Sequence, residues 1–130
     1  MLKMDAAGLL VQDMAVSVAF YRDVLGMRTE WNGDANATLF SGSMRLILYS
    51  RADFERMTAQ RYTYAACLNG AFELSFSVPR FSDVDTEYAR VTAAGATPVF
   101  PPTDEPWGQR TCYVADPDGN LIELSSFGQA

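Results

Sequence analysis

Two glutamates occupy strand-like positions where a carboxylate could do chemistry. Glu123 interrupts the apolar run "NLIEL", which follows the turn "DPDG", and Glu73 takes a polar place in the alternating segment "FELSFSV". A carboxylate within a strand is costly to bury unless something pairs with it. Each could accept hydrogen bonds from an amine-bearing ligand, bind a metal ion or act as a general base, or simply face water. The residues alone leave these alternatives open.

The chain contains no histidine. That absence removes both the commonest general base and the commonest transition-metal ligand. Serine-nucleophile motifs and phosphate-binding glycine spacings are missing as well. The two cysteines, Cys67 and Cys112, follow no metal or redox spacing, so we expect reduced, buried thiols in a cytoplasmic protein.

Aromatic side chains beside an arginine form a second group of candidates. Trp107 and Arg110 precede the strand-like run at 111–115, and an indole and a guanidinium could stack on or clamp a planar ligand. The alternative is that the Pro-Trp-Gly corner only closes the edge of a sheet. Trp31 carries the same ambiguity, and Tyr62 and Tyr64 could form either a lid or an interface.

Composition limits the classes of function. The chain of 130 residues is long enough for one domain with a real core, and 48% of its residues are hydrophobic. Ten basic and sixteen acidic residues give a net charge of −6, which argues against nucleic acid and is compatible with a neutral or cationic small ligand. No apolar run approaches the roughly 18–20 residues that span a bilayer, and the N-terminus does not resemble a secretory leader.

The elements that must position these residues occur twice. Helical periodicity predicts helices near 13–26 and 82–95, each preceded by a short strand, at 8–11 and 72–78. Hairpin patterns with the turns "SGS" and "DPDGN" follow them, at 37–50 and 111–127. The order is strand, helix, three strands, repeated at about half the chain length. This repeat predicts an α+β domain over 1–130, made of modules 1–50 and 71–130 joined by a connector, 51–70.

The segments "FYRDVLGM" and "DPDGNLIEL", with the helical segment "SDVDTEYARVTAAGA", closely resemble the vicinal oxygen chelate superfamily. That superfamily includes glyoxalase I, bleomycin-resistance and fosfomycin-resistance proteins and extradiol dioxygenases. The resemblance covers the whole chain except the connector. It implies two tandem βαβββ modules whose curved sheets form a cup-shaped, half-open barrel, usually within a homodimer. It does not choose among lyases, transferases, oxygenases and drug-binding proteins, because the fold serves all of them.

In metal-using members of the superfamily each module supplies one ligand from its first strand and one from its last. Carried onto this chain, the resemblance implies Ala6, Leu48, Glu73 and Glu123 at these positions. Alanine and leucine cannot bind a metal, and transition metals normally take three or four protein ligands. We therefore expect no metal or other cofactor, with Glu73 and Glu123 as weak candidates for a divalent ion.

The expected function is that of a metal-free protein resembling the bleomycin-resistance proteins, which binds and sequesters a small organic molecule, drug or metabolite. Leu10, Leu46 and Leu48 would form the apolar part of the cup. The ligand-binding residues expected are Leu48, Glu73, Trp107, Arg110 and Glu123, and the expected partners are a cationic organic ligand and a second copy of the chain. The alternative is a glyoxalase- or dioxygenase-like enzyme that uses Glu73 and Glu123 with a divalent metal or as acid–base groups. A third possibility is a structural or regulatory dimer.

Overall fold

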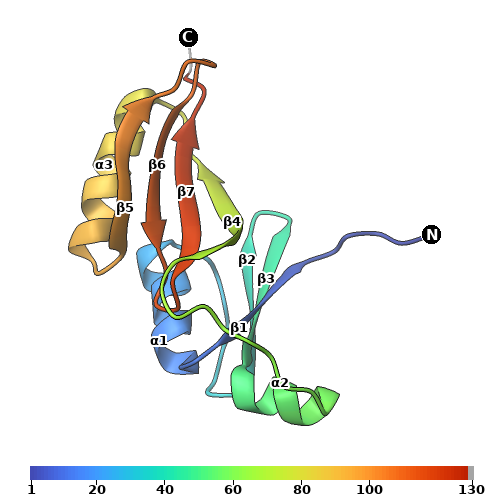
Figure 1. Ribbon diagram of the computed structural model, residues 1–130. Helices are drawn as coiled ribbons and strands as arrows, with labels where there is room; N and C mark the ends of the chain where they lie inside the picture. Colours follow the sequence, from blue (N-terminus) through green and yellow to red (C-terminus); the bar gives the residue numbers. More distant parts are fainter. Residues whose placement is uncertain (129–130) are drawn as a thin grey trace. The chain divides into compact units, whose positions relative to one another are not determined.

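Figure 1 shows the computed structural model, which describes residues 1–128. The chain is an α+β protein with two sheets, and it divides into two compact units, Met1–Tyr64 and a second that begins at Ala65. The first unit contains β1 (Ala7–Val11), α1 (Met14–Ala19), the π-helical turn η1 (Phe20–Val24), β2 (Asn36–Ser41), β3 (Met44–Ser50) and α2 (Arg51–Thr58). The second unit contains β4 (Asn69–Ser77), α3 (Phe81–Ala93), β5 (Thr97–Asp104), β6 (Arg110–Ala115) and β7 (Asn120–Ser126).

The sheet of the first unit has the order β1-β3-β2, with β1 parallel and β2 antiparallel to β3. Leu9 lies opposite Leu48 in the register, and both are buried on the face against which α1 packs. Neighbouring residues along each strand point to the other face, where Leu10 lies opposite Tyr49. That second face is partly covered by α2, because the rings of Tyr49 and Phe54 lie 5.0 Å apart.

The first helix begins where the sequence predicts. The Asp13 side chain accepts a hydrogen bond from the Val16 backbone N–H at 3.1 Å, and Gly26, with φ of +80°, lies just beyond the helix end. Between them the helix widens into the π-turn η1. Tyr21, within this turn, is fully buried, whereas Val16 of α1 is 50% exposed.

The first unit departs from the predicted order of one strand, one helix and three strands. Among the described residues of this unit, only two strands, β2 and β3, follow the first helix. The expected third strand is reduced to a single β-bridge between Arg28 and Phe40. The segment after Arg28, "TEWNGDA", is polar and lacks the alternation of a half-buried strand, and Gly33 within it has φ of +103°. The connector also contains a helix, α2, which the charged segment "RADFERMT" indicates.

The sheet of the second unit has the order β4-β7-β6-β5, and α3 covers one of its faces (Figure 1). Val84 and Val91 of α3 are buried. The strand residues that alternate toward this helix include Cys112, Val114, Ile122 and Leu124, all buried. The opposite side, which carries the other strand residues, is called the open face of the second sheet below.

A tight turn fixes the hairpin of β6 and β7. The Asp116 carboxylate accepts hydrogen bonds from the backbone N–H groups of Asp118 and Asn120, both at 2.9 Å. Gly119 has φ of +87°, and a Cβ at this position would collide with the carbonyl oxygen of Cys67. The turn therefore requires glycine at position 119, and it fixes the register that positions Glu123.

None of the helices found within residues 1–128 is long and apolar enough to cross a membrane.

Candidate functional site

Four side chains lie in one row across the open face of the second sheet, one from each strand. The register places Phe100 of β5 opposite Tyr113 of β6, Tyr113 opposite Glu123 of β7, and Glu123 opposite Ser75 of β4. Directly opposite residues point to the same side of a sheet, so the four side chains share the open face. We call this set the Glu123 row.

Glu123 is the centre of the row and is only 8% exposed. Its carboxylate accepts one hydrogen bond from the Ser75 hydroxyl at 2.6 Å and another from the Tyr113 hydroxyl at 2.9 Å. Both donors are neutral. The carboxylate is therefore held in place and hydrogen-bonded rather than facing water, but no cation neutralises it within the row.

Tyr113 is kept protonated by the same arrangement. Its pKa is raised above the usual value, mainly by burial, and further by its hydrogen bond to Glu123 and by the charges of Glu123 and Glu73. Glu73 is exposed and lies two residues before Ser75, on the same face of β4. The structure thus brings both predicted glutamates to one face. The Tyr113 phenol, which donates to Glu123, lies beside the Phe100 ring, and the centroids of these two rings are 6.3 Å apart.

Arg110 lies on the other side of this sheet, contrary to its expected position beside the glutamates. It has the same strand parity as Cys112 and Val114 and forms ion pairs at 2.8 Å with Asp85 of α3 and Asp104 of β5. These partners raise its pKa further above its usual value. The sequence pattern placed Arg110 before the strand, so it did not predict which face the side chain takes. In the structure Arg110 is the first residue of β6.

Trp107 lies in the turn between β5 and β6 and is 63% exposed. Its indole N–H donates to the Gln109 side-chain oxygen at 2.8 Å, and the Gly108 backbone N–H donates to the carbonyl oxygen of Glu105 at 3.1 Å. The structure does not bring the indole into the Glu123 row. Its role as a ligand contact remains a prediction.

Leu48 also lies on a different face from the one expected. It is fully buried opposite Leu9, on the side of β3 that faces α1, and Leu46 shares that side. The other face of β3 carries Ile47 and Tyr49 instead. Ala6, just before β1, keeps the parity of Gly8 and is therefore not paired with Leu48 across one face. The segment "LILY" is apolar at consecutive positions, so its sequence does not reveal which residues face the helix.

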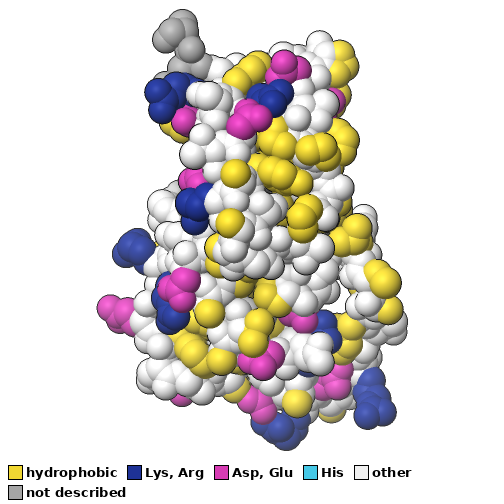
Figure 2. Space-filling model, turned by 90° about the vertical axis from the view of Figure 1, so that its left-hand side faces the viewer, with side chains coloured by type: hydrophobic (Ala, Val, Ile, Leu, Met, Phe, Trp, Pro, Cys, Tyr) yellow, Lys and Arg dark blue, Asp and Glu magenta, His cyan; other side chains and the backbone are white. Residues whose placement is uncertain are grey.

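The sequence prediction did not include Ser75, Phe100 or Tyr113. The signal that could have found Tyr113 is the hairpin turn, because a tight turn over 116–119 sets Tyr113 opposite Glu123. Figure 2 shows acidic and basic side chains interspersed on one face of the molecule, and hydrophobic side chains gathered over its upper part. In the second unit the exposed large apolar side chains are Leu68, Phe72, Phe100, Trp107 and Phe127.

Residues 3–124 match the model of the Glyoxalase/Bleomycin resistance protein/Dioxygenase superfamily. The chain belongs to this superfamily. It is 32% identical over 120 residues to the uncharacterized protein YraH of Bacillus subtilis (strain 168), covering 89% of this chain and 91% of that protein.

Solved structures share the fold at lower identity. A glyoxalase-related enzyme from Fulvimarina pelagi superposes with a TM-score of 0.83 at 21% identity, covering 97% of this chain and 88% of the other. A lactoylglutathione lyase from Agrobacterium tumefaciens superposes with a TM-score of 0.73 at 22% identity, covering 95% and 92%. These similarities establish the glyoxalase fold and leave the reaction, if any, open.

The residues present do not fit the metal that the superfamily implies. Across residues 1–128 no three Cys, Asp or Glu side chains come together in a way that could hold a metal ion. Of the four positions that the resemblance implies, Ala6 lacks a donor atom and Leu48 is a core residue. Glu73 and Glu123 alone would supply two carboxylates, fewer than the three or four protein ligands that transition metals normally take.

Proposed function

We propose that this protein binds a small, cationic organic molecule on the open face of the second sheet, and that Glu123 orients the ligand without a metal. The observation that carries the proposal is the Glu123 row, a buried carboxylate held by two neutral donors beside aromatic rings. A ligand ammonium or amidinium group would supply the missing positive charge. Sequestration of a drug or metabolite, as in the bleomycin-resistance proteins of this superfamily, is the activity that such a site would support.

The row is suited to a ligand with both a charged and an apolar part. Glu123 and Glu73 supply negative charge on one face, while the rings of Phe100 and Tyr113 extend that face on the other side of Glu123. An aromatic face attracts a cation through its quadrupole and also covers apolar surface. Small-molecule sites are usually lined by apolar side chains together with a few polar groups.

The proposal predicts binding without turnover. A thermal-shift screen of aromatic amines, followed by calorimetric titration of the best compound, should give a saturable site after treatment with a chelator. Glu123→Gln should weaken that binding by at least about tenfold, since a hydrogen bond to a charged group contributes about 1.5–3 kcal/mol. Glu87→Gln on α3 is the matched control and should bind like the unchanged protein.

Three outcomes would contradict the proposal. Binding that requires added divalent metal would favour the enzyme alternative, as would chemical conversion of the ligand that Glu123→Gln abolishes. Unchanged affinity in both Glu73→Gln and Glu123→Gln would remove the glutamates from the site altogether.

A further inference from the structure

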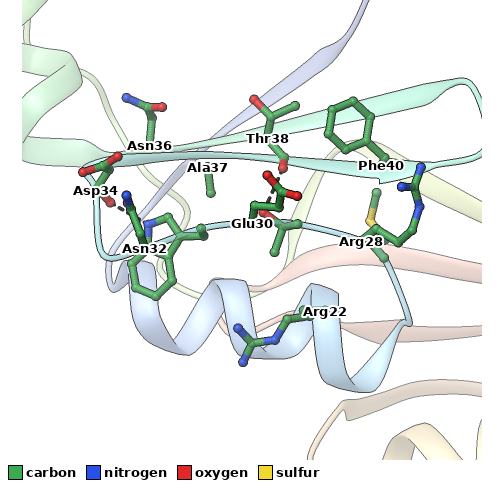
Figure 3. Close-up of a pocket in the computed structure, with 12 residues that line it drawn as sticks. Arg22, Arg28, Glu30, Asn32, Asp34, Asn36, Ala37, Thr38 and Phe40 are labelled. Carbon is green, nitrogen blue, oxygen red and sulfur yellow. Dashed lines mark hydrogen bonds between the residues drawn. The ribbon is translucent and has the colours of Figure 1, made fainter.

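The first unit contains a cavity lined only by residues of that unit. Its volume is about 880 Å³, within the range of roughly 300–1,000 Å³ typical of small-molecule sites. Figure 3 shows that it opens between β2 and the segment 28–34, which separates from β2 beyond the single bridge. Its lining includes Arg22, Arg28, Glu30, Trp31, Asn36 and Thr38.

One wall of the cavity is an unpaired strand edge. Phe40 exchanges backbone hydrogen bonds with Arg28, at 2.9 and 3.0 Å, so the backbone groups of Phe40 point away from β3. By strand alternation those of Thr38 and Asn36 point the same way. The Thr38 carbonyl accepts from the Thr29 hydroxyl at 2.9 Å, but within residues 1–128 the N–H groups of Thr38 and Asn36 have no partner. These two donors are available to a ligand.

An acceptor lies opposite these donors. In Figure 3 the Glu30 carboxylate extends from the segment toward Thr38. The arginines of the lining are engaged elsewhere: Arg22 binds both carboxylate oxygens of Asp23, at 2.8 and 2.9 Å, and Arg28 lies over the Phe40 ring at 5.7 Å. Among the described residues Glu30 forms no ion pair or hydrogen bond. The cavity thus presents N–H donors facing a carboxylate acceptor.

Trp31 adds an aromatic surface to the same lining. It is half-buried, and its indole N–H donates to the carbonyl oxygen of Asp34 at 2.7 Å. This hydrogen bond restrains the indole among the residues that line the cavity. A restrained indole offers a planar ring a stacking partner with little loss of side-chain entropy.

We propose that this cavity binds a planar amino-heteroaromatic molecule, one with a ring acceptor atom next to an exocyclic amine. The ring acceptor would take the Thr38 N–H, the amine would donate to Glu30, and the ring would stack on Trp31. The site is formed by the first unit alone, so it is independent of the function proposed for the Glu123 row.

Adenine and hypoxanthine test the proposal as a matched pair. Adenine has a ring acceptor beside an amine, whereas hypoxanthine carries a ring N–H beside a carbonyl, which reverses the pattern. The chain has two tryptophans, so a Trp107→Phe variant reports on Trp31 alone. Titration with adenine should change its fluorescence saturably, and hypoxanthine should bind at least about tenfold more weakly, the cost of a mismatched hydrogen bond to a charged group.

Variants in the same Trp107→Phe background locate the binding. Glu30→Ala should weaken adenine binding by at least about tenfold, while Glu87→Ala on α3 should leave it unchanged. Circular dichroism would show that each variant is folded. The proposal is overturned if adenine gives no saturable change up to its solubility limit, if hypoxanthine binds equally well, or if folded Glu30→Ala retains full affinity.

Discussion

At the scale of single residues, Glu123 is a carboxylate whose two donors are both hydroxyl groups. Glutamine keeps only one acceptor oxygen and turns an amide N–H₂ toward the other hydroxyl. We therefore expect Glu123→Gln to lower the free energy of unfolding by about 1–3 kcal/mol. Urea denaturation measures this loss.

Glu73→Gln is the control for that measurement, because Glu73 is exposed on the same face. We expect it to change stability by no more than about 0.5 kcal/mol. Equal losses for the two variants would mean that the hydroxyl donors contribute nothing specific to Glu123.

Two neighbouring residues of β6 should make the protein sensitive to alkali. Burial raises the pKa of Cys112 from 9.0 to about 11, and burial with the Glu123 hydrogen bond raises the pKa of Tyr113 above its usual 10.0. The folded state retains protons that the unfolded chain releases. Stability from these groups is complete below about pH 9 and falls as the pH rises toward 11 and beyond.

Denaturant melts between about pH 8 and pH 11 would measure this fall, with the sign fixed by the raised pKa values. Cys112→Ala removes one of the two groups and should make the alkaline decline shallower. A decline that stays equally steep in Cys112→Ala and in Tyr113→Phe would show that other groups cause it.

At the scale of elements, the hairpin of β6 and β7 depends on its turn. Gly119 combines a positive φ with a position where any Cβ meets the Cys67 carbonyl oxygen. We expect Gly119→Ala to cost about 3 kcal/mol or more, since strain and a backbone collision add together. Gly42, in the turn between β2 and β3, also has positive φ but open space around it, so Gly42→Ala should cost only about 1 kcal/mol. Thermal melts of both variants compare the two costs.

Arg110 joins α3 to β5 across the back of the second sheet. Its partners are largely exposed, so the ion pairs contribute little, and Arg110→Met should lower stability by about 1 kcal/mol. Because Arg110 does not share the open face with Glu123, its replacement should leave affinity for a cationic ligand unchanged. If a stable Arg110→Met protein lost much of its affinity for the cationic ligand, Arg110 would have to be part of the binding site.

The sequence predicted elements better than faces. Asp13 and Gly26 delimit the first helix as expected, and the alternation of β4 placed Glu73 correctly. The face of Leu48 could not be predicted, because consecutive apolar residues leave parity undetermined until the pairing with Leu9 is known. Tyr113 was missed for a related reason, since a cross-strand neighbour depends on register rather than on local pattern.

The lost strand of the first unit has a physical reason of its own. The module repeat predicts three strands after the helix, but the polar residues that follow Arg28 cannot bury one face, and only the bridge from Arg28 to Phe40 remains of the third strand. Repetition of a fold therefore does not guarantee repetition of each element. The cavity of the first unit results from this departure.

At the scale of the whole molecule, the edges of the two sheets differ in how well they are protected. β5 carries Pro98, Pro101 and Pro102, which cannot donate backbone hydrogen bonds, whereas β1 and β4, two of the other three edge strands, contain no proline. We propose that the chain forms a homodimer that covers the unprotected edges. Light scattering during size-exclusion chromatography should return about twice the monomer mass at micromolar concentration. A monomer mass would reject the proposal.

The turn at 116–119 also bears on how the protein ages chemically. Asp118 followed by Gly119 is the dipeptide most prone to isomerise through a cyclic imide, which forms when the glycine nitrogen attacks the aspartate carboxyl carbon. Here the Gly119 N–H is held at 3.0 Å by the Asp116 carbonyl oxygen, and the Asp118 N–H is held by the Asp116 side chain. These two hydrogen bonds hold the backbone on both sides of the Asp118 side chain, so the Gly119 nitrogen cannot easily rotate to attack the Asp118 carboxyl carbon. The folded protein should therefore accumulate isoaspartate at position 118 far more slowly than the unfolded chain does.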